Sequence, residues 1–374
     1  MGFGLTITVG DALTPLKQVM PWLVEARVEM ELSKPTRYAL RFEEDICEGK
    51  PEVASNEAFV KNTKLGLFVR NADNVDECLV FGPVTKVRAS SVLGGPGSWV
   101  EIHGEDRRVE MGRITVVSKH KGKASAVAAQ ILQAYGFDPK TDDTLIEHDD
   151  QTFQLTQSAT DLAFLEDVAR RNNLEFWLEY ELKGPSKLIE TANLRTSPER
   201  SQASKSLSVP KLVPEAGKVL RVNPPPGECA NITRFDTRIN FEKPASAQGF
   251  LMSDKDEKAV VAQLAPVPPP NDPEKIQPVP GIVRKLVETK VNHEETFLAN
   301  EALVFEQSWF VEVDCSATLE QLDFVVRPHQ IVEVANAGDA LSGGYQVMKA
   351  THVVTSTDHL MDFTIRANGL GGAG

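Results

Sequence analysis

The sequence has few cysteines and no long apolar run. Its four cysteines are Cys47, Cys78, Cys229 and Cys315, and no two of them form a Cys-x-x-Cys pair. This pattern excludes a zinc ribbon and argues against a disulfide framework, so we expect four reduced thiols. No uninterrupted apolar stretch of about 18 residues occurs, so no membrane insertion is expected. The first residues lack a basic segment followed by an apolar one, which predicts synthesis in the cytoplasm without a signal peptide.

Positive charge and aromatic residues are also scarce. The chain of 374 residues has 40 Lys and Arg against 53 Asp and Glu, which gives a formal net charge of −13. A protein that grips phosphates would carry the opposite balance, so we expect no stable binding of nucleic acid. Aromatic residues make up 7% of the chain, which leaves few for the exposed platforms of a glycan-binding module.

Motifs for catalysis and metal binding are absent or incomplete. His293-Glu294-Glu295-Thr296-Phe297 begins like the zinc motif His-Glu-x-x-His, but Phe297 stands where the second ligand is required. The acidic run at 147–150 lacks the glycine and the distal glutamate of a calcium loop. No Gly-x-Ser-x-Gly elbow and no phosphate-binding loop occur. We therefore predict no enzyme activity, no cofactor and no bound metal.

The first 119 residues show the patterns of β-strands. Ala26–Leu32 and Arg37–Ile46 alternate apolar with polar residues, which is typical of half-buried strands. Further strands are predicted at Leu65–Val69, Cys78–Val87 and Trp99–His103. Short strands at short spacing predict a β-barrel or sandwich over residues 1–119.

Residues 120–182 change to a helical pattern. Ser125–Tyr135 and Thr160–Arg171 place apolar residues at helical spacing, and Leu174–Glu181 is predicted as a strand. Ser158 and Asp161 have the spacing of a capping box at the start of the second helix. We therefore predict a small α/β domain at 120–182.

The rest of the chain is predicted as a linker followed by a second β domain. Residues 183–228 are rich in Ser, Pro, Lys and Gly and are assigned to the linker. The second domain, 229–374, contains a Pro-rich insertion at 243–292, in which 264–280 is expected to be a stiff extended arm. It should also contain one helix, and the predicted elements are a strand at Ile232–Phe241, a helix at Glu294–Trp309, and strands at Leu322–Arg327, Gln330–Ala335, Gly344–Val354 and Met361–Ala367.

A weak internal repeat links the two β regions. Val69–Asp73 is followed by Phe81–Val87, and late in the chain Val334–Asp339 is followed by Tyr345–Ala350 at a similar separation. Chance is one explanation for so short a match. The other is that one barrel occurs twice in the chain.

Three segments resemble the phage late control gene D family, which comprises the baseplate hubs of contractile tails and the hub half of type VI secretion (VgrG) spikes. The first is a helix of the form Asp-x-x-Phe-Leu-x-x-x-Ala that follows a glutamine. An ordinary amphipathic helix followed by a strand would satisfy the same residues. The matching positions are Gln157, Asp161, Phe164, Leu165 and Ala169.

The other two segments lie in the predicted β domains. Phe81 and Gly82, followed by Gly104 and Asp106, resemble a pair of strands in that family. Near the end of the chain the resemblance rests on Tyr345, Val347 and His352. His329 follows Arg327-Pro328 where the family usually has glycine, so the turn there is expected to differ.

The resemblance implies a mainly β fold with α+β parts, in which two similar β-barrel tube domains are joined by a small α/β insert and a Pro-rich arm. It also implies a homotrimer that forms a pseudo-sixfold ring between a tail tube and a spike. Tube or tube-initiator proteins and other baseplate proteins would be further partners, in a virion or an injection particle. Because the sequence ends at Gly374, just past the second barrel, we expect the trimeric spike to be a separate protein.

Charge adds a hypothesis about transport. Three copies would carry −39 formal charges, three times −13, and an acidic lumen would let DNA or another acidic cargo slide. Two other functions stay open. One is a β-rich module that binds glycans or cell walls, and a less favoured one is a hydrolase whose site is assembled from distant residues. Activity on cell-wall material would distinguish the hydrolase from a hub.

Overall fold

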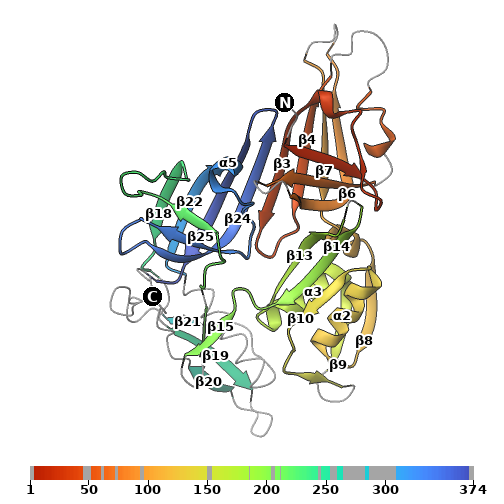
Figure 1. Cartoon of the computed structure of the whole chain (residues 1–374). Coiled ribbons are helices and arrows are strands. Elements are labelled where there is room, and N and C mark those ends of the chain that lie inside the picture. The colour runs from red at the N-terminus through yellow and green to blue at the C-terminus, as the bar shows by residue number, and fades with distance from the viewer. Residues whose placement is uncertain are drawn as a thin grey trace.

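A computed structural model shows a mainly β protein with a few short helices (Figure 1). No helix among the described residues is long and apolar enough to cross a bilayer. The structure describes residues 4–44, 52–59, 63–71, 75–92, 97–149, 154–184, 186–203, 207–210, 212–242, 246–252, 259–263, 283–285 and 309–369.

The N-terminal barrel is built around one hydrophobic core. Alternate residues of its strands point inward, as the sequence pattern predicts, and the core includes Val28, Leu40, Phe42 and Ile102. The expected strand Arg37–Ile46 ends at Glu43. The strands are β1 (Leu5–Val9), β2 (Thr14–Pro15), β3 (Leu23–Glu31), β4 (Arg37–Glu43), β5 (Lys64–Arg70), β6 (Asp76–Ser90) and β7 (Trp99–Glu105), with 3-10 turns at Met20–Trp22 and Glu57–Phe59.

The C-terminal barrel has a second core of its own, which includes Val313, Val347 and Phe363. The expected strand at Leu322–Arg327 is wrong. Only Leu322 of it is in regular structure, as the last residue of helix α5 (Leu319–Leu322), whose start is held by a capping box of Thr318 and Gln321; residues 323–327 are irregular. The strands are β17 (Val219–Arg221), β18 (Arg234–Ile239), β22 (Val311–Thr318), β23 (Ile331–Ala335), β24 (Gly343–Thr355) and β25 (His359–Ala367).

One continuous sheet joins the two barrels. Strand β24 of the C-terminal barrel pairs antiparallel with β3 of the N-terminal barrel, from Lys349 opposite Glu31 to Thr355 opposite Glu25. The pairing order along the sheet is β18-β22-β25-β24-β3-β4-β7-β6-β5-β1-β2. The barrels are therefore held together by backbone hydrogen bonds as well as by side chains (Figure 1).

The two barrels repeat one topology. The order β3-β4-β7-β6-β5-β1 in the first barrel corresponds to β18-β22-β25-β24-β23-β17 in the second, and the strands also follow the same order along the chain. One difference is that β1 pairs antiparallel with β5, whereas β17 pairs parallel with β23.

The repeat extends to a single bulge. The pairing of β6 with β7 shifts register between Val84 and Lys86, and that of β24 with β25 shifts between Val347 and Lys349. In both barrels the first bulge residue donates its N–H to the strand before it, from Val84 to the Thr63 carbonyl and from Val347 to the Gln330 carbonyl, each at 2.9 Å. The weak repeat in the sequence therefore marks equivalent hairpins.

The α/β unit packs two helices on a small sheet, with Ala128, Leu132, Leu165 and Leu194 in its core. Thr160, rather than Ser158, caps α3 by accepting a hydrogen bond from the Ala163 N–H. The elements are α1 (Arg108–Met111), β8 (Thr115–His120), β9 (Gly122–Lys123), α2 (Ala124–Ala134), β10 (Asp138–Thr141), β11 (Glu147–His148), β12 (Leu155–Thr160), α3 (Asp161–Arg171), β13 (Glu175–Leu182) and β14 (Leu188–Arg195).

Part of the predicted linker at 183–228 forms a strand of the α/β unit. Strand β14, within 183–228, pairs with β10 and β13 and buries Ala192 and Leu194, so it completes the α/β unit. The expected arm at 264–280 and the expected helix Glu294–Trp309, apart from Trp309 itself, lie outside the described residues. The remaining strands are β15 (Arg200–Ala203), β16 (Leu207–Pro210), β19 (Ser246–Met252), β20 (Ala259–Gln263) and β21 (Val283–Lys285).

Candidate functional site

The two signature glycines of the N-terminal barrel lie where the backbone is crowded. A Cβ atom at Gly82 would lie 1.9 Å from the carbonyl oxygen of Glu105, and one at Gly104 would lie 2.1 Å from the ring of Tyr38. The Tyr38 hydroxyl donates to the Gly82 carbonyl at 3.1 Å, which fixes the ring in this place. Only glycine therefore fits at either position.

Asp106 ties the barrel to the α/β unit through a buried ion pair. Its carboxylate accepts the Thr36 N–H at 2.6 Å and pairs with Arg108 at 2.7 Å, and both charged side chains are almost fully buried. Arg108 also donates to the carbonyls of Lys34 at 2.7 Å and Phe176 at 2.9 Å. One guanidinium therefore binds the turn before β4 and strand β13 at once. Phe81 is buried nearby, where the barrel meets Tyr180 of the α/β unit.

Gln157 and Asp161 form a hydrogen-bond network at the start of α3. Gln157 Nε2 donates to Asp161 Oδ1 at 2.7 Å, and the Tyr135 hydroxyl donates to Asp161 Oδ2 at 2.8 Å. Burial, and the carboxylate of Asp161, raise the pKa of Tyr135 to about 12. His120 contacts the other end of the Gln157 amide at 2.9 Å. The remaining signature residues of this segment, Phe164, Leu165 and Ala169, are buried in the core.

The C-terminal signature residues lie in and around the second core. The Tyr345 hydroxyl donates to the Leu341 carbonyl at 2.8 Å, and Val347 is buried. His352 is fully buried, with one ring nitrogen 2.9 Å from the Val326 carbonyl and the other 2.9 Å from His359. Burial lowers the pKa of His359 to about 4 and that of His352 well below its usual value. Both rings are therefore neutral at pH 7.

The signature residues are thus spread over three places and form no common reactive site. Each of them packs in a hydrophobic core, allows two strands to cross closely, or stabilises the junction between the N-terminal barrel and the α/β unit. Among the described residues, no group of three or more His, Cys, Asp or Glu side chains could hold a metal ion.

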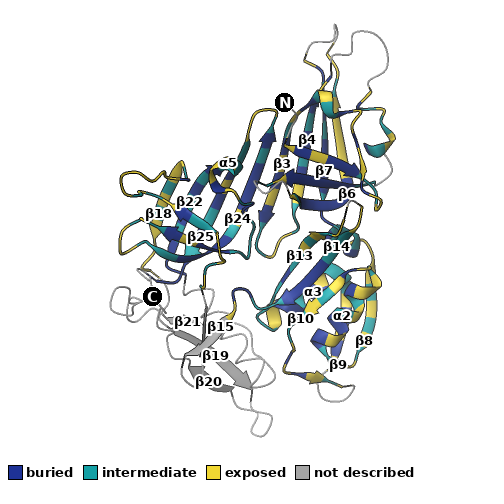
Figure 2. Ribbon diagram, viewed as in Figure 1, coloured by how far each residue is buried: buried dark blue, intermediate teal, exposed yellow. Residues whose placement is uncertain are grey.

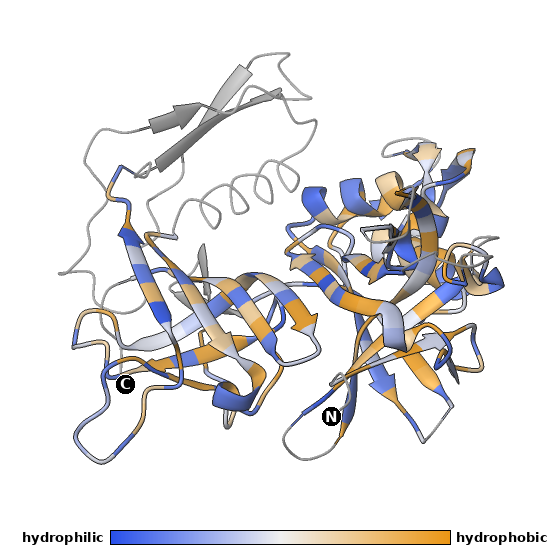
Figure 3. Cartoon of the chain, turned by 90° about the horizontal axis from the view of Figure 1, so that it is seen from above, coloured by the Kyte–Doolittle hydropathy of each residue, from blue (hydrophilic) through white to orange (hydrophobic). Residues whose placement is uncertain are grey.

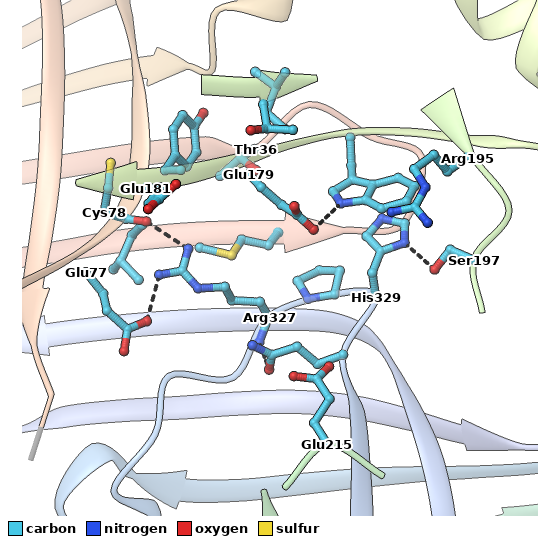
Figure 4. A pocket seen from close by; sticks show the side chains of 18 of the residues that line it. Thr36, Glu77, Cys78, Glu179, Glu181, Arg195, Ser197, Glu215, Arg327 and His329 are labelled. Carbon is cyan, nitrogen blue, oxygen red and sulfur yellow. Dashed lines mark hydrogen bonds and ion pairs between the residues drawn. The ribbon is translucent and has the colours of Figure 1, made fainter. Parts of the chain in front are cut away.

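A cavity of about 790 Å³ lies where the two barrels and the α/β unit meet (Figure 4). Arg327, at its floor, donates to the Cys78 carbonyl at 2.7 Å and to Glu77 at 3.1 Å, so it joins the C-terminal barrel to β6. On the other side of the cavity, His329 stacks on Trp177 with ring centroids 4.0 Å apart. The cavity is therefore walled by contacts between the three units.

His329 adopts a glycine-type conformation although it is not glycine. Its φ of +73° lies in the left-handed region that favours glycine. The stacked ring and a 2.8 Å hydrogen bond to Ser197 Oγ hold it there. No local sequence pattern indicated the roles of Trp177 and Ser197, because their common partner His329 is more than a hundred residues away.

The contact between Ser197 and His329 does not form a nucleophilic pair. Burial, followed by the positive charges of Arg108 and Arg366, lowers the pKa of His329 to about 3. A catalytic base needs a pKa near the working pH and a third group that orients it. Ser197 Oγ instead meets the buried amide of Gln346 at 3.2 Å. The geometry is that of a structural junction.

The strands of the long sheet mix buried with exposed positions (Figure 2) and hydrophobic with hydrophilic residues (Figure 3). The outward face carries both signs of charge. Neighbouring strands are linked by ion pairs, such as Arg37 to Glu105 at 3.3 Å and Arg238 to Asp314 at 3.1 Å. Acids and bases are nearly equal in number on the eight strands from β18 to the outer half of β6 (Thr85–Ser90), whereas Asp76 and Glu77 lie on the half of β6 that pairs with β5. The acids are Glu25, Glu29, Glu31, Glu43, Glu101, Glu105, Asp236, Glu312, Asp314 and Asp362, and the bases are Arg27, Arg37, Arg41, Lys86, Arg88, Arg234, Arg238, Lys349 and Arg366.

Comparisons with known proteins identify the fold. No family model and no curated protein matches the chain. Among solved structures, the tail protein from Neisseria meningitidis MC58 is similar with a TM-score of 0.62 and 11% identity, covering 99% of this chain and 98% of that one. The 43 kDa tail protein of prophage MuSo2 from Shewanella oneidensis gives 0.58 and 12%, covering 96% and 97%.

A third similar structure comes from a secretion system. It is the E. coli c3393 protein, described as a component of the type VI secretion system with structural similarity to the T4 bacteriophage tail proteins gp27 and gp5. Its TM-score is 0.53 at 13% identity, covering 99% of this chain and 79% of that one. The resemblance seen in the sequence is thus confirmed at the level of the fold, together with the predicted fold class.

Proposed function

We propose that the chain is a structural hub protein of a contractile phage tail or a phage-derived injection system. Three copies form a ring that joins a six-fold tail tube to a separate three-fold spike. The observation that carries this proposal is the repeated barrel, whose two copies share strand order, register and bulge within one sheet. Three copies of such a chain present six equivalent barrels, which is the geometry that a six-fold partner requires.

A head-to-tail contact closes such a ring, because isologous contacts produce pairs rather than rings of three. Eight strands from each copy run along the continuous sheet from β18 to β6. At a strand spacing of about 4.8 Å, and with the usual tilt of strands in barrels, three copies enclose a circle roughly 35–50 Å across at the backbone. That opening is wide enough for an unfolded or slender cargo and its water.

The polar outward face of the sheet is the surface that we assign to the lumen. Positive and negative side chains alternate on it, since six of its nine basic side chains form ion pairs with acids, as in the pairs of Arg88 with Glu101 and Arg238 with Asp314. This modifies the hypothesis of an acidic lumen. The excess of acidic residues lies elsewhere on the chain, and we propose that the lumen resists adhesion because no large patch of one sign is available to a cargo.

The division into domains is part of the proposal. We propose tube-type barrels at the two ends of the chain and an α/β unit between them, with its boundary moved from 182 to Arg195 because β14 belongs to its sheet. The partners would be the tail tube or its initiator, the spike and other baseplate proteins. The role is structural, without cofactor or metal, and the particle is a virion or an injection particle.

The test is the native mass of the purified chain, measured by light scattering with and without a candidate spike protein, combined with negative-stain images of the same peak. We expect a species of three times 41.0 kDa with an axial hole. A chain that stays monomeric in the presence of the spike and tube proteins encoded beside it contradicts the proposal. Binding to purified cell-wall glycans by such a monomer would favour the glycan-binding module instead.

A further inference from the structure

Strand β18 and the outer half of strand β6 each have one edge without a partner among the described residues. Among the described strands, β18 pairs only with β22. The outer half of β6, from Thr85 to Ser90, pairs only with β7 among the described strands, because β5 and Thr63 cover the rest. Open edges of this kind expose unpaired backbone groups and tend to pair with another chain. Here the two edges bound the run of eight neighbouring strands from β18 to β6.

The repeat inside the chain shows how such edges fit together. Strand β24 is the equivalent of β6, and β3 is the equivalent of β18. Within the chain β24 pairs with β3, and this pairing joins one barrel to the next. If the same contact follows every barrel around a ring, the next joint is made by β6 of one copy and β18 of its neighbour.

The register of this joint can be derived from the registers already present. The shared bulge equates Lys349 with Lys86 and Ala350 with Val87. In each barrel the pairing can be followed from the bulge strand across two strands to the edge strand, through β25 and β22 to β18 in one barrel and through β7 and β4 to β3 in the other. This places Ile239 of β18 at the position that Met30 occupies in β3. Because Ala350 lies opposite Met30 within the chain, Val87 of one copy lies opposite Ile239 of the next.

Burial supports this register independently. Ala350 and Met30 are 0% and 5% exposed, whereas their equivalents Val87 and Ile239 are 44% and 37% exposed and belong to the few large apolar side chains on the surface. Both of these residues point to the side of their strands that faces the barrel cores. A neighbouring copy placed in this register covers each with the other.

We propose that β18 of one copy pairs antiparallel with β6 of the next copy, with Val87 opposite Ile239, and that this contact closes the ring of three. The inference rests on the proposed function, since it needs the ring. A ring of three does not by itself require these strands, this direction or this register. The occupant of each open edge is a second copy of this chain.

Charges on the lumen side are compatible with the contact. Ser90 falls opposite Asp236, which it can reach with its hydroxyl. Arg88 falls opposite Arg238, but each guanidinium already has a carboxylate of its own chain, Glu101 at 3.5 Å and Asp314 at 3.1 Å. Each of the two like charges is therefore neutralised by an acid on the side away from the contact, which offsets part of their repulsion.

Cysteine cross-linking of the assembled protein tests the register. In a background with Cys47→Ser and Cys229→Ser, the pair Val87→Cys and Ile239→Cys is oxidised with copper phenanthroline and run on a non-reducing gel. Directly opposite residues have Cβ atoms about 4.5–5.5 Å apart, which is near the separation a disulfide needs, whereas diagonal neighbours are about 7–8 Å apart. We expect a ladder that ends at the covalent trimer.

The matched control keeps Val87→Cys and places the second cysteine at Thr237, two residues along the same face of β18. We expect at least a tenfold lower cross-linking rate for this pair, and no trimer from either single-cysteine variant. If light scattering shows a trimer but the control cross-links as fast as the Val87–Ile239 pair, or neither cross-links, the register is wrong while the ring stands. If no trimer forms with the spike present, the ring and this inference fail together.

Discussion

Loss of the carboxylate of Asp106 should destabilise the chain more than loss of any exposed ion pair. In Asp106→Asn, the guanidinium of Arg108 stays buried and charged, with carbonyl oxygens of Lys34 and Phe176 as its remaining partners. Removal of one partner from a buried ion pair costs about 3–5 kcal/mol. The amide of asparagine still accepts the Thr36 N–H, so we expect a loss at the lower end, about 3 kcal/mol, in the free energy of unfolding.

The assay is urea unfolding followed by tryptophan fluorescence, with Trp177 at the junction as one reporter. The matched control is Glu29→Gln, which removes the exposed pair with Arg27 and should cost about 0–1 kcal/mol. In the double variant Asp106→Leu, Arg108→Met no buried charge remains, so part of the stability should return. An Asp106→Asn protein that unfolds within 1 kcal/mol of the wild type would refute the view that this pair holds the barrel to the α/β unit.

The remaining predictions concern close packing, pH and assembly. Gly82→Ala should cost at least about 1–3 kcal/mol, because the new methyl group meets the backbone of Glu105, which cannot swing away; a melting temperature equal to that of the wild type would argue against the crowding. The free energy of unfolding should fall as pH drops from about 6.5 towards 4. The reason is that the unfolded chain takes up protons on His359 and His352 at a higher pH than the folded chain does. Denaturant midpoints measured across that range should decline less steeply in His359→Asn than in the wild type. Val87→Asp should abolish the trimer in light scattering while leaving the melting temperature of the monomer unchanged, since Val87 is exposed there; a normal trimer would contradict the proposed contact.

Local patterns predicted the elements whose periodicity is set by near neighbours. The helices at 125–135 and 160–171 are confirmed to within a residue or two as α2 and α3, because their apolar stripe repeats along a single segment. The strand at Leu322–Arg327 was wrong because a run of apolar residues does not distinguish a strand from a short helix and the turn after it. Strand β14 was missed because its surroundings resemble a linker in composition.

Composition and local periodicity were enough to predict a mainly β chain with a small α/β part between its strands, and they showed that motifs for catalysis and metal binding are absent or incomplete. A short repeat in the sequence also indicated the repeated barrel, since Val84-Thr85-Lys86 and Val347-Met348-Lys349 occupy the same bulge. The pairing of β24 with β3 and the hydrogen bond from Arg327 to the Cys78 carbonyl became visible in the folded chain alone. Such contacts join residues hundreds of positions apart, and a chain records in its local periodicity which face of a strand is buried but not which distant edge that strand will meet.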